Sequence, residues 1–244
     1  GLIERVMVSN EPAGDAGLEV RALHQRAVSR LDTEVGALLE GLRTRGLLED
    51  ALVIITSDHG EAFGAHSLVE HSKDVYEDLV KVPLLVKAPG QTAGRVATER
   101  ASSVDVPGLV AGALESSGFP VLARSFTRAP GNHPVVVENY YSRLRDLERF
   151  GDRFRRRRVA IYEGSRKFIL DSAAAPELYD LAVDPAELDD LAERDAASVA
   201  DMARSLEVLL SAGAFQGQRA LPDQLTRQQA DEMSELGYGG GEGR

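Results

Sequence analysis

The residues best suited to chemistry follow a short apolar segment. Leu52 to Ile55 are aliphatic and mostly β-branched, which favours a buried strand, and Asp58 and His59 come soon after it. Polar side chains at the carboxyl end of such a strand lie where α/β sheets bind their ligands. A carboxylate and an imidazole can ligate a divalent cation together, and Gly60 lets the backbone turn close to such an ion. The alternative is a strand that ends in an ordinary polar turn.

Four polar residues in the following loop are further candidates for the same site. His71, 12 residues beyond His59, carries an imidazole that can protonate a departing oxygen near neutral pH. Lys73 is the alternative anion contact, and Glu61 is expected to orient the loop or a ligand through hydrogen bonds. His66 is equally compatible with local packing. For His71 and Lys73 the simpler alternative is a solvated surface residue.

An ordered series of motifs is similar to the sulfatase family of the alkaline-phosphatase superfamily. The strand and Ser-Asp-His-Gly-Glu at 57–61 are followed by the histidine loop and then by Val-Pro-Leu and Pro-Gly at 82–90. Glu-Leu-Tyr-Asp-Leu at 177–181 and Asp-Pro-Ala-Glu at 184–187 resemble the family's downstream signature. Leu-Gly-Tyr at 236–238 matches a common family tail. Three matches in this order are far more specific than any one of them.

The resemblance implies a fold, an activity and a cofactor. The fold expected is α/β, an alkaline-phosphatase-like parallel sheet with covering helices, followed by a small carboxyl-terminal antiparallel sheet with a helix. The activity expected is hydrolysis of sulfate esters, with His71 as the catalytic residue and Glu61, His66 and Lys73 near the substrate. Asp58 and His59 are expected to ligate a divalent cation. Calcium is usual in the family, where many members carry Asn in place of His59, and the imidazole shifts the preference toward manganese or zinc.

The chain departs from the family pattern in the residues that would supply the nucleophile. Family members carry Cys/Ser-x-Pro-x-Arg, whose first residue becomes formylglycine, and paired aspartates on the first strand; neither feature is present, and the chain contains no cysteine. We therefore expect the carboxyl-terminal part of a longer enzyme. Two alternatives stay open, a phosphodiesterase or phosphonate monoester hydrolase of the same superfamily and a non-catalytic fragment.

Composition limits the partners. Lys and Arg number 28 against 39 Asp and Glu, a net charge of −11, which disfavours binding to nucleic acid because phosphate attraction needs a positive surface. The basic run Arg153 to Arg158 is expected to be solvated. No apolar window is long enough for a transmembrane span. The expected partner is a small-molecule or carbohydrate sulfate ester, while oligomeric state and a cytoplasmic, periplasmic or secreted location stay open.

Periodicity and turn residues predict the elements that position these side chains. Alternating helices and strands predict a parallel sheet in 1–118, and short strands predict a small α+β subdomain in 119–211, before a flexible tail at 212–244. The helices are expected at 18–45, 74–79 with Asp74 as N-cap, 106–116 and 197–210. The strands are expected at 52–56, 82–87, 135–138, 158–162 and 167–170.

Overall fold

A computed structural model describes residues 1–244 apart from 10, 72, 117–133, 140–143 and 212–244. The chain divides into two compact units, Gly1–Met202 and Ala203–Arg244, and each is considered by itself. The α-helices are α1 (Gly14–Thr44), α2 (Glu77–Val80), α3 (Val106–Ser116), α5 (Leu144–Phe150) and α6 (Ala196–Ser211). The strands are β1 (Val53–Thr56), β2 (Ala62–Phe63), β3 (Val69–Glu70), β4 (Leu84–Lys87), β5 (Val136–Asn139), β6 (Arg158–Glu163), β7 (Arg166–Asp171) and β8 (Glu177–Asp180).

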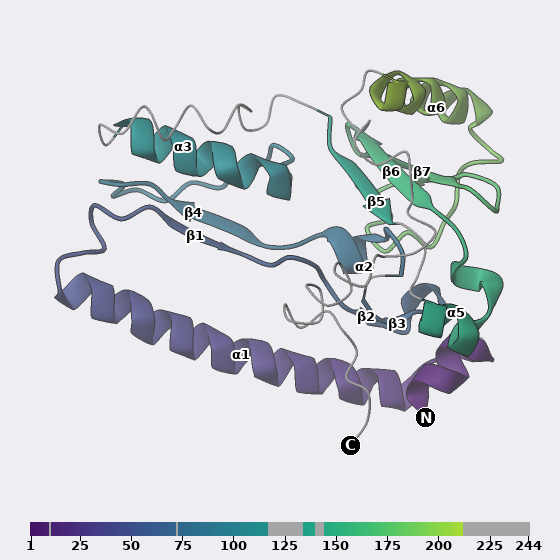
Figure 1. The fold of residues 1–244 in the computed structure, drawn as a ribbon, viewed down its shortest axis with the longest axis horizontal. Coiled ribbons are helices and arrows are strands. Elements are labelled where there is room, and N and C mark those ends of the chain that lie inside the picture. The colour runs from purple at the N-terminus through teal and green to yellow at the C-terminus, as the bar shows by residue number, and fades with distance from the viewer. Residues whose placement is uncertain (10, 72, 117–133, 140–143, 212–244) are drawn as a thin grey trace. The chain divides into compact units, whose positions relative to one another are not determined.

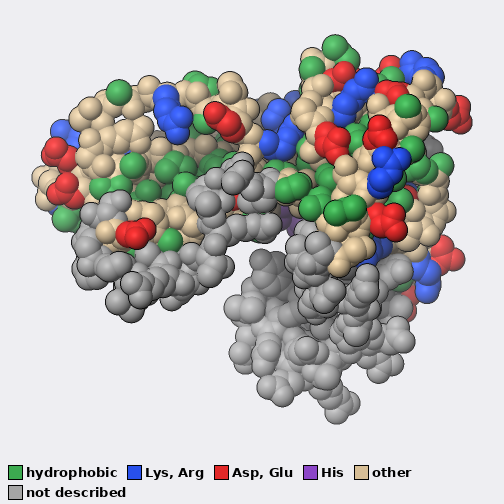
Figure 2. Space-filling view, turned by 90° about the horizontal axis from the view of Figure 1, so that it is seen from above, with side chains coloured by type: hydrophobic (Ala, Val, Ile, Leu, Met, Phe, Trp, Pro, Cys, Tyr) green, Lys and Arg blue, Asp and Glu red, His purple; other side chains and the backbone are tan. Residues whose placement is uncertain are grey.

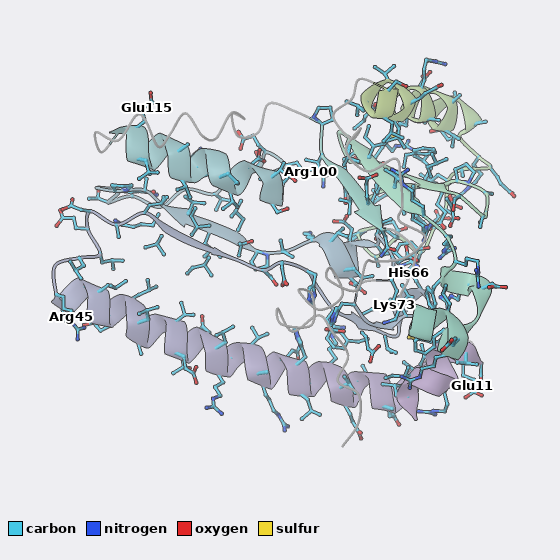
Figure 3. All side chains as sticks on the ribbon, viewed as in Figure 1. Glu11, Arg45, His66, Lys73, Arg100 and Glu115 are labelled. Atoms are coloured by element: carbon cyan, nitrogen blue, oxygen red, sulfur yellow. The ribbon has the colours of Figure 1, made fainter. Side chains whose placement is uncertain are left out.

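Helix α1 confirms the helix expected at 18–45. It ends at Gly46, whose φ of +70° suits a residue without a side chain, and the amide of Leu47 donates to the carbonyl of Leu42 across this turn. The apolar residues that recur along the helix are largely exposed: Leu23 is 61% and Leu38 63% accessible. Side chains of α1 project from opposite sides of the helix (Figure 3). The predicted helix is therefore present, but its apolar face is not packed by the described residues.

Strands β1 and β4 run side by side (Figure 1), and their relative direction differs from the one expected. The two strands were expected to be parallel, but they pair in the antiparallel direction, with Val53 opposite Lys87 and Thr56 opposite Leu84. A parallel pair needs a crossover that returns the chain along the whole sheet, usually through a helix. The described part of the connection contains the four-residue helix α2, a 3-10 turn at Ala65–Ser67 and the short strands β2 and β3, and the chain re-enters the sheet in the opposite direction.

The loop that carries the candidate residues packs on the main core. Leu68, Val69, Val75 and Leu79 are buried in one cluster with Phe150, Phe154 and residues of β6, β7 and β8. Asp74 was expected to cap the short helix, and this is wrong. Tyr76 occupies the N-cap position of α2, and the Asp74 carboxylate is drawn into a buried ion network because two guanidinium groups lie within reach of it.

The strands after residue 134 form the expected antiparallel sheet, in the order β5-β6-β7-β8. The β6–β7 hairpin turns at Gly164, where φ is +57°. Leu178 and Tyr179, which belong to the motif at 177–181, are buried. Helices α3 and α6 also confirm the predicted helices within a residue or two. The domain boundaries at 118 and 211 stay predictions, and the tail at 212–244 lies outside the described residues.

Surface charge agrees with the acidic composition. Basic and acidic side chains are interspersed with hydrophobic ones over the described part of the face in Figure 2. In the same part of the chain, no helix has the length and apolarity needed to cross a membrane.

Candidate functional site

Asp58 and His59 present their ligating atoms from the turn after β1. His59 Nδ1 lies 2.8 Å from the carbonyl oxygen of Gly60, so Nδ1 carries the proton and donates it to that acceptor. This tautomer leaves the lone pair on Nε2, which is 3.8 Å from Asp58 Oδ2. Both side chains are open to solvent: that of His59 is 40% accessible and that of Asp58 is 74% accessible. The loop therefore offers one imidazole nitrogen and one carboxylate oxygen to a common ligand.

His71 is held against His59. The two rings are stacked with centroids 4.1 Å apart and planes 18° from parallel. Nδ1 of His71 lies 3.2 Å from Glu61 Oε2, so its proton points to the carboxylate and Nε2 faces away from it. Glu61 fixes the second imidazole as the Gly60 carbonyl fixes the first. The structure thus brings four predicted site residues together.

Two observations bear on whether this donor set fits a divalent cation. A hydrogen bond from Nδ1 to a backbone carbonyl is the usual way in which a protein orients a metal-ligating histidine, and His59 makes that bond. The two ligand atoms are too far apart to bond each other but close enough to share an ion. Within the described ranges, no group of three or more histidines, cysteines or acidic residues could hold a metal. The fit is therefore that of two ligands from a larger set.

His66 and Lys73 make contacts within the protein. The His66 ring stacks on Tyr76 with centroids 3.6 Å apart, and its Nε2 lies 3.1 Å from the carbonyl oxygen of Ala186. The Lys73 side chain is 8% accessible, and its ammonium donates to Glu70 at 3.0 Å and to the carbonyl of His71 at 3.3 Å. Both are labelled in Figure 3. Their observed contacts support the backbone of the loop.

Gly60 serves a purpose that differs from the one expected. A Cβ atom at this position would lie 2.1 Å from the backbone carbonyl oxygen of Asp78, and the Gly60 amide donates to the carbonyl of Leu79 at 2.8 Å. The absence of a side chain lets the end of β1 approach helix α2 directly. Gly60 thereby joins the Asp58–His59 turn to the segment that follows His71.

A cavity of about 850 Å³ opens beside Asp58 and His59. Its wall also includes Arg100, whose guanidinium lies over the ring of Tyr162 at 4.2 Å from the centroid. The remaining lining is mixed, with valines of β5 and the hydroxyls of Ser102 and Ser103. The volume falls in the range of small-molecule binding sites, which combine apolar walls with a few polar groups.

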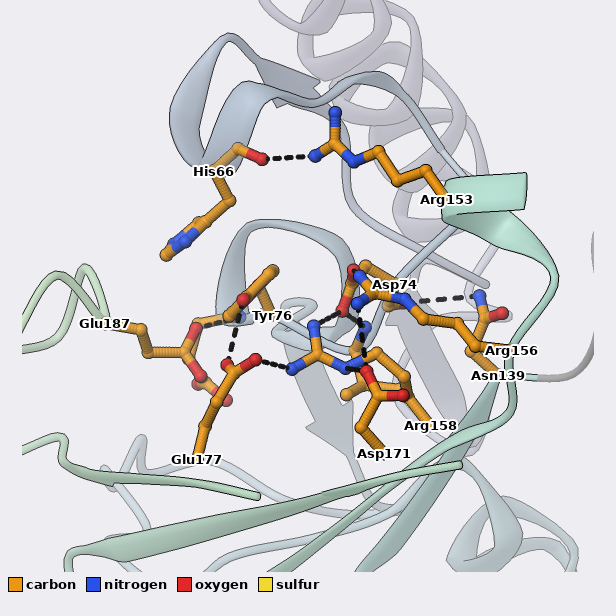
Figure 4. A network of polar contacts seen from close by, with 12 residues as sticks. His66, Asp74, Tyr76, Asn139, Arg153, Arg156, Arg158, Asp171, Glu177 and Glu187 are labelled. Atoms are coloured by element: carbon orange, nitrogen blue, oxygen red, sulfur yellow. Dashed lines mark hydrogen bonds and ion pairs between the residues drawn. The ribbon is translucent and has the colours of Figure 1, made fainter. Parts of the chain in front are cut away.

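A buried ion network lies directly after His71, and the sequence did not reveal it (Figure 4). The Asp74 carboxylate pairs with Arg158 at 2.5 Å and with Arg156 at 3.0 Å, and Asp171 lies within 3.2 Å of both guanidinium groups. The expectation that the arginine run is solvated is wrong for Arg158, whose side chain is 1% accessible. Arg158 begins β6, and the Arg156 side chain before it is 19% accessible, whereas Arg155, which follows the short helix at Asp152–Phe154, is 61% accessible.

The network sets the charge state of its members. Burial by itself lowers the pKa of the Arg158 guanidinium, but the negative charges around it, Asp74 foremost, raise that pKa above its ordinary value. Burial acts to raise the pKa of Glu77, and Lys167 outweighs it and lowers that pKa. Burial raises the pKa of Glu187, against the opposing charge of Lys167. Arg158 therefore stays charged in the interior through its acidic partners.

The signature at 184–187 has a structural explanation in this network. Glu187 has φ of +56° and a side chain that is 1% accessible. Its carboxylate accepts from the amide of Glu77 and pairs with Lys167 at 2.7 Å. Lys167 in turn donates to the carbonyl of Val75 at 2.7 Å. The Asp-Pro-Ala-Glu motif thus ties the turn after β8 to the start of helix α2.

Comparisons with known proteins agree with the motifs. A family model described as Sulfatase matches residues 4–116. The choline-sulfatase of Rhizobium meliloti (strain 1021) is 32% identical over 168 residues, which are 68% of this chain and 32% of that protein. The chain therefore spans about a third of the length of this curated relative.

Two solved structures show the same fold. The phosphonate monoester hydrolase of Agrobacterium radiobacter has a TM-score of 0.62 at 24% identity, covering 79% of this chain and 41% of that one. A protein in complex with its substrate D-glucosamine-2-N,6-O-disulfate has a TM-score of 0.54 at 20% identity, again covering 79% and 41%. The predicted alkaline-phosphatase-like fold is confirmed. From its ordered motifs, its fold and its relatives, this chain belongs to the sulfatase family.

Proposed function

We propose that the protein containing this chain hydrolyses sulfate esters, with Asp58 and His59 as ligands of a divalent cation and His71 as general acid. The observation that carries the proposal is the stacked pair of imidazoles. Each Nδ1 faces an oxygen acceptor, Gly60 O or Glu61 Oε2, so each Nε2 is left for chemistry. The stacking of the two rings supports a proton donor at His71 beside a metal ligand at His59, a combination that suits cleavage of an ester at a metal-bound group.

Each residue has a separate task. Asp58 and His59 hold the cation, which when bound polarises the oxygens of the ester. His71 acts as the imidazolium, which delivers the proton on Nε2 to the departing oxygen and keeps the proton on Nδ1, and Glu61 stabilises the ring in the orientation that allows this. The Lys73 ammonium donates a hydrogen bond to the backbone carbonyl oxygen of His71 and so supports the backbone at that residue. The cavity beside Asp58 accommodates the alcohol part of the substrate.

Family members generally use a divalent metal, and we propose calcium here, with manganese or zinc as alternatives because of His59. Carboxylate oxygen suits calcium, whereas imidazole nitrogen suits the softer ions. The substrate proposed is a small-molecule or carbohydrate sulfate ester. Two similar proteins support these classes, a choline-sulfatase and a protein in complex with its substrate D-glucosamine-2-N,6-O-disulfate.

The test separates the two histidines in the intact protein. His59→Ala should lower metal occupancy, and excess metal should restore part of the rate. His71→Ala should leave occupancy unchanged and lower kcat by about two to four orders of magnitude. The loss should be largest for alkyl sulfates, whose alcohols leave poorly, and small for activated aryl sulfates. Steady-state kinetics on both ester classes and metal analysis of the purified variants check this.

His24→Ala is the matched control, because His24 is exposed on α1 and contacts Phe63 rather than the site. This variant should keep both rate and occupancy. Equal losses on both ester classes in His71→Ala would remove the general-acid role. Faster turnover of phosphodiesters or phosphonates than of sulfates would favour the phosphoryl-transfer alternative, and an inactive intact protein would favour a non-catalytic one.

A further inference from the structure

We propose that Arg158, the first residue of β6, is a positioning residue that holds the His71 loop in its active geometry through Asp74. The proposal rests on the proposed function, because it assigns Arg158 a part in the proton transfer by His71. Arg158 is not itself a cavity-lining residue and has no contact with the imidazole pair among the described contacts, but its partner Asp74 lines the cavity. We infer that its effect on the reaction passes through Asp74 and the backbone of residues 73–77.

That backbone segment is fixed by side chains of the antiparallel sheet at almost every step. Arg158 and Arg156 hold the Asp74 carboxylate. Lys167 Nζ binds the carbonyl of Val75 at 2.7 Å and the Glu77 carboxylate at 2.9 Å. Glu177 accepts a hydrogen bond from Tyr76 at 2.8 Å and also pairs with Arg158. These charged and polar contacts form one connected group, shown in part in Figure 4.

Strain just before His71 indicates that the loop needs such support. Glu70 has φ of +69°, and His66 and Ser67 have φ of +51° and +53°. Residues without glycine's freedom keep such angles only where the surroundings hold them. The guanidinium of Arg153 binds the carbonyls of His66 and Ser67 at 2.8 and 3.0 Å. The strained part of the loop is thus held by the same arginine run as Asp74.

A short relay connects the fixed residue to the imidazole. Asp74 follows Lys73, whose ammonium bridges the Glu70 carboxylate and the His71 carbonyl. A shift of Asp74 would move both anchors of His71, whose half-exposed ring has only Glu61 and His59 as recorded side-chain contacts. A misplacement of about 1 Å can reduce a rate about 100-fold when a reacting group must be aligned. Arg158 is therefore expected to act on the proton-transfer step and not on metal binding.

The experiment compares Arg158→Met, Arg158→Lys and Asp74→Asn in the intact protein. Arg158→Met should lower kcat for alkyl sulfates about 10- to 100-fold, with little change for activated aryl sulfates and none in KM or metal affinity. Arg158→Lys should recover part of the loss because it keeps the charge. Arg155→Met is the control, since Arg155 is exposed and, among the described residues, forms an ion pair with Asp152. This variant should change neither kcat nor the amide hydrogen exchange of residues 73–77.

Combination with His71→Ala decides between positioning and general damage. If Arg158 acts through His71, Arg158→Met should add nothing to the loss already caused by His71→Ala on alkyl sulfates. Additive losses, equal losses on both ester classes, or weakened metal binding would overturn the proposal. If Arg158→Met fails to fold, Asp74→Asn is judged by the same criteria, because it keeps the shape of the side chain while removing the charge.

Hydrogen exchange makes the result independent of the proposed function. Arg158→Met should speed amide exchange in residues 73–77 while β6 and β7 keep their protection, and unchanged exchange in that segment would overturn the positioning role. A wild-type protein that cleaves no sulfate ester, with faster exchange in the variant, would remove the proposed function and with it the catalytic consequence, while the structural coupling would stand.

Discussion

At the scale of single residues, Gly60 connects the Asp58–His59 turn to helix α2, in the segment that follows His71. The nearest atom to a Cβ at this position would be a backbone carbonyl oxygen, which cannot rotate away as a flexible side chain would. We expect Gly60→Ala to lower the free energy of unfolding by about 1 to 3 kcal/mol, a usual cost of overpacking. The backbone shift should also weaken metal binding by the neighbouring Asp58 and His59.

Gly36→Ala is the matched control for this substitution. Gly36 lies in the middle of α1, and a Cβ there meets nothing within 4 Å. Alanine should raise the free energy of unfolding by about 0.5 to 1 kcal/mol, because it favours the helix over the unfolded chain. Denaturant titration of both variants measures the two effects. A Gly60→Ala variant as stable as the parent would show that helix α2 yields to the added methyl group.

At the scale of elements, the sheet β5-β6-β7-β8 carries buried phenols whose ionisation opposes folding. Burial raises the pKa of Tyr76, which packs beside β8 residue Tyr179, to about 12. Burial also raises the pKa values of Tyr162 and Tyr179 above their ordinary value. In the unfolded chain these groups ionise near pH ~10. Their contribution to stability is therefore complete below that pH and is lost as pH rises toward the folded values.

We expect the free energy of unfolding to fall between pH ~10 and ~12, with Tyr76 alone accounting for about 3 kcal/mol. Tyr76→Phe should be less stable at neutral pH, because the hydroxyl donates to Glu177, and should show a shallower alkaline decline. Urea titrations at a series of pH values, with ultraviolet absorbance of tyrosinate, measure both quantities. An alkaline decline of equal steepness in both proteins would assign it to other groups.

At the scale of the whole molecule, apolar side chains are exposed on α1 and on the β1–β4 pair. Leu31 is 59% and Leu85 56% accessible. Exposed apolar side chains, where they are close together, bind hydrophobic dyes and favour association. We expect the 244-residue chain to bind such a dye at neutral pH, and replacement of Leu23, Leu31 and Leu38 by glutamate to reduce the fluorescence. Val96→Glu is the control, since Val96 is 91% accessible outside any helix or strand. A cooperative monomer with low dye binding would contradict this expectation.

The sequence by itself determined the local elements and the family, and it identified candidate site residues. Helical spacing of apolar residues predicted α1, α3 and α6, and β-branched runs predicted β1 and the β6–β7 hairpin, because these signals act over a few residues. The polar residues after β1 identified Asp58 and His59 as site candidates, and their roles stay proposals. The ordered motifs identified the sulfatase family.

Only the tertiary structure decided which groups meet. The direction of β4 against β1 depends on how the connection returns, and its sequence pattern is the same for either direction. The sequence pattern did not predict the burial of Arg158, Lys167 and Glu187, which follows from oppositely charged partners elsewhere along the chain. A charge is buried only where an opposite charge compensates the lost hydration. That compensation is a property of three-dimensional contacts, and periodicity along the chain carries no record of it.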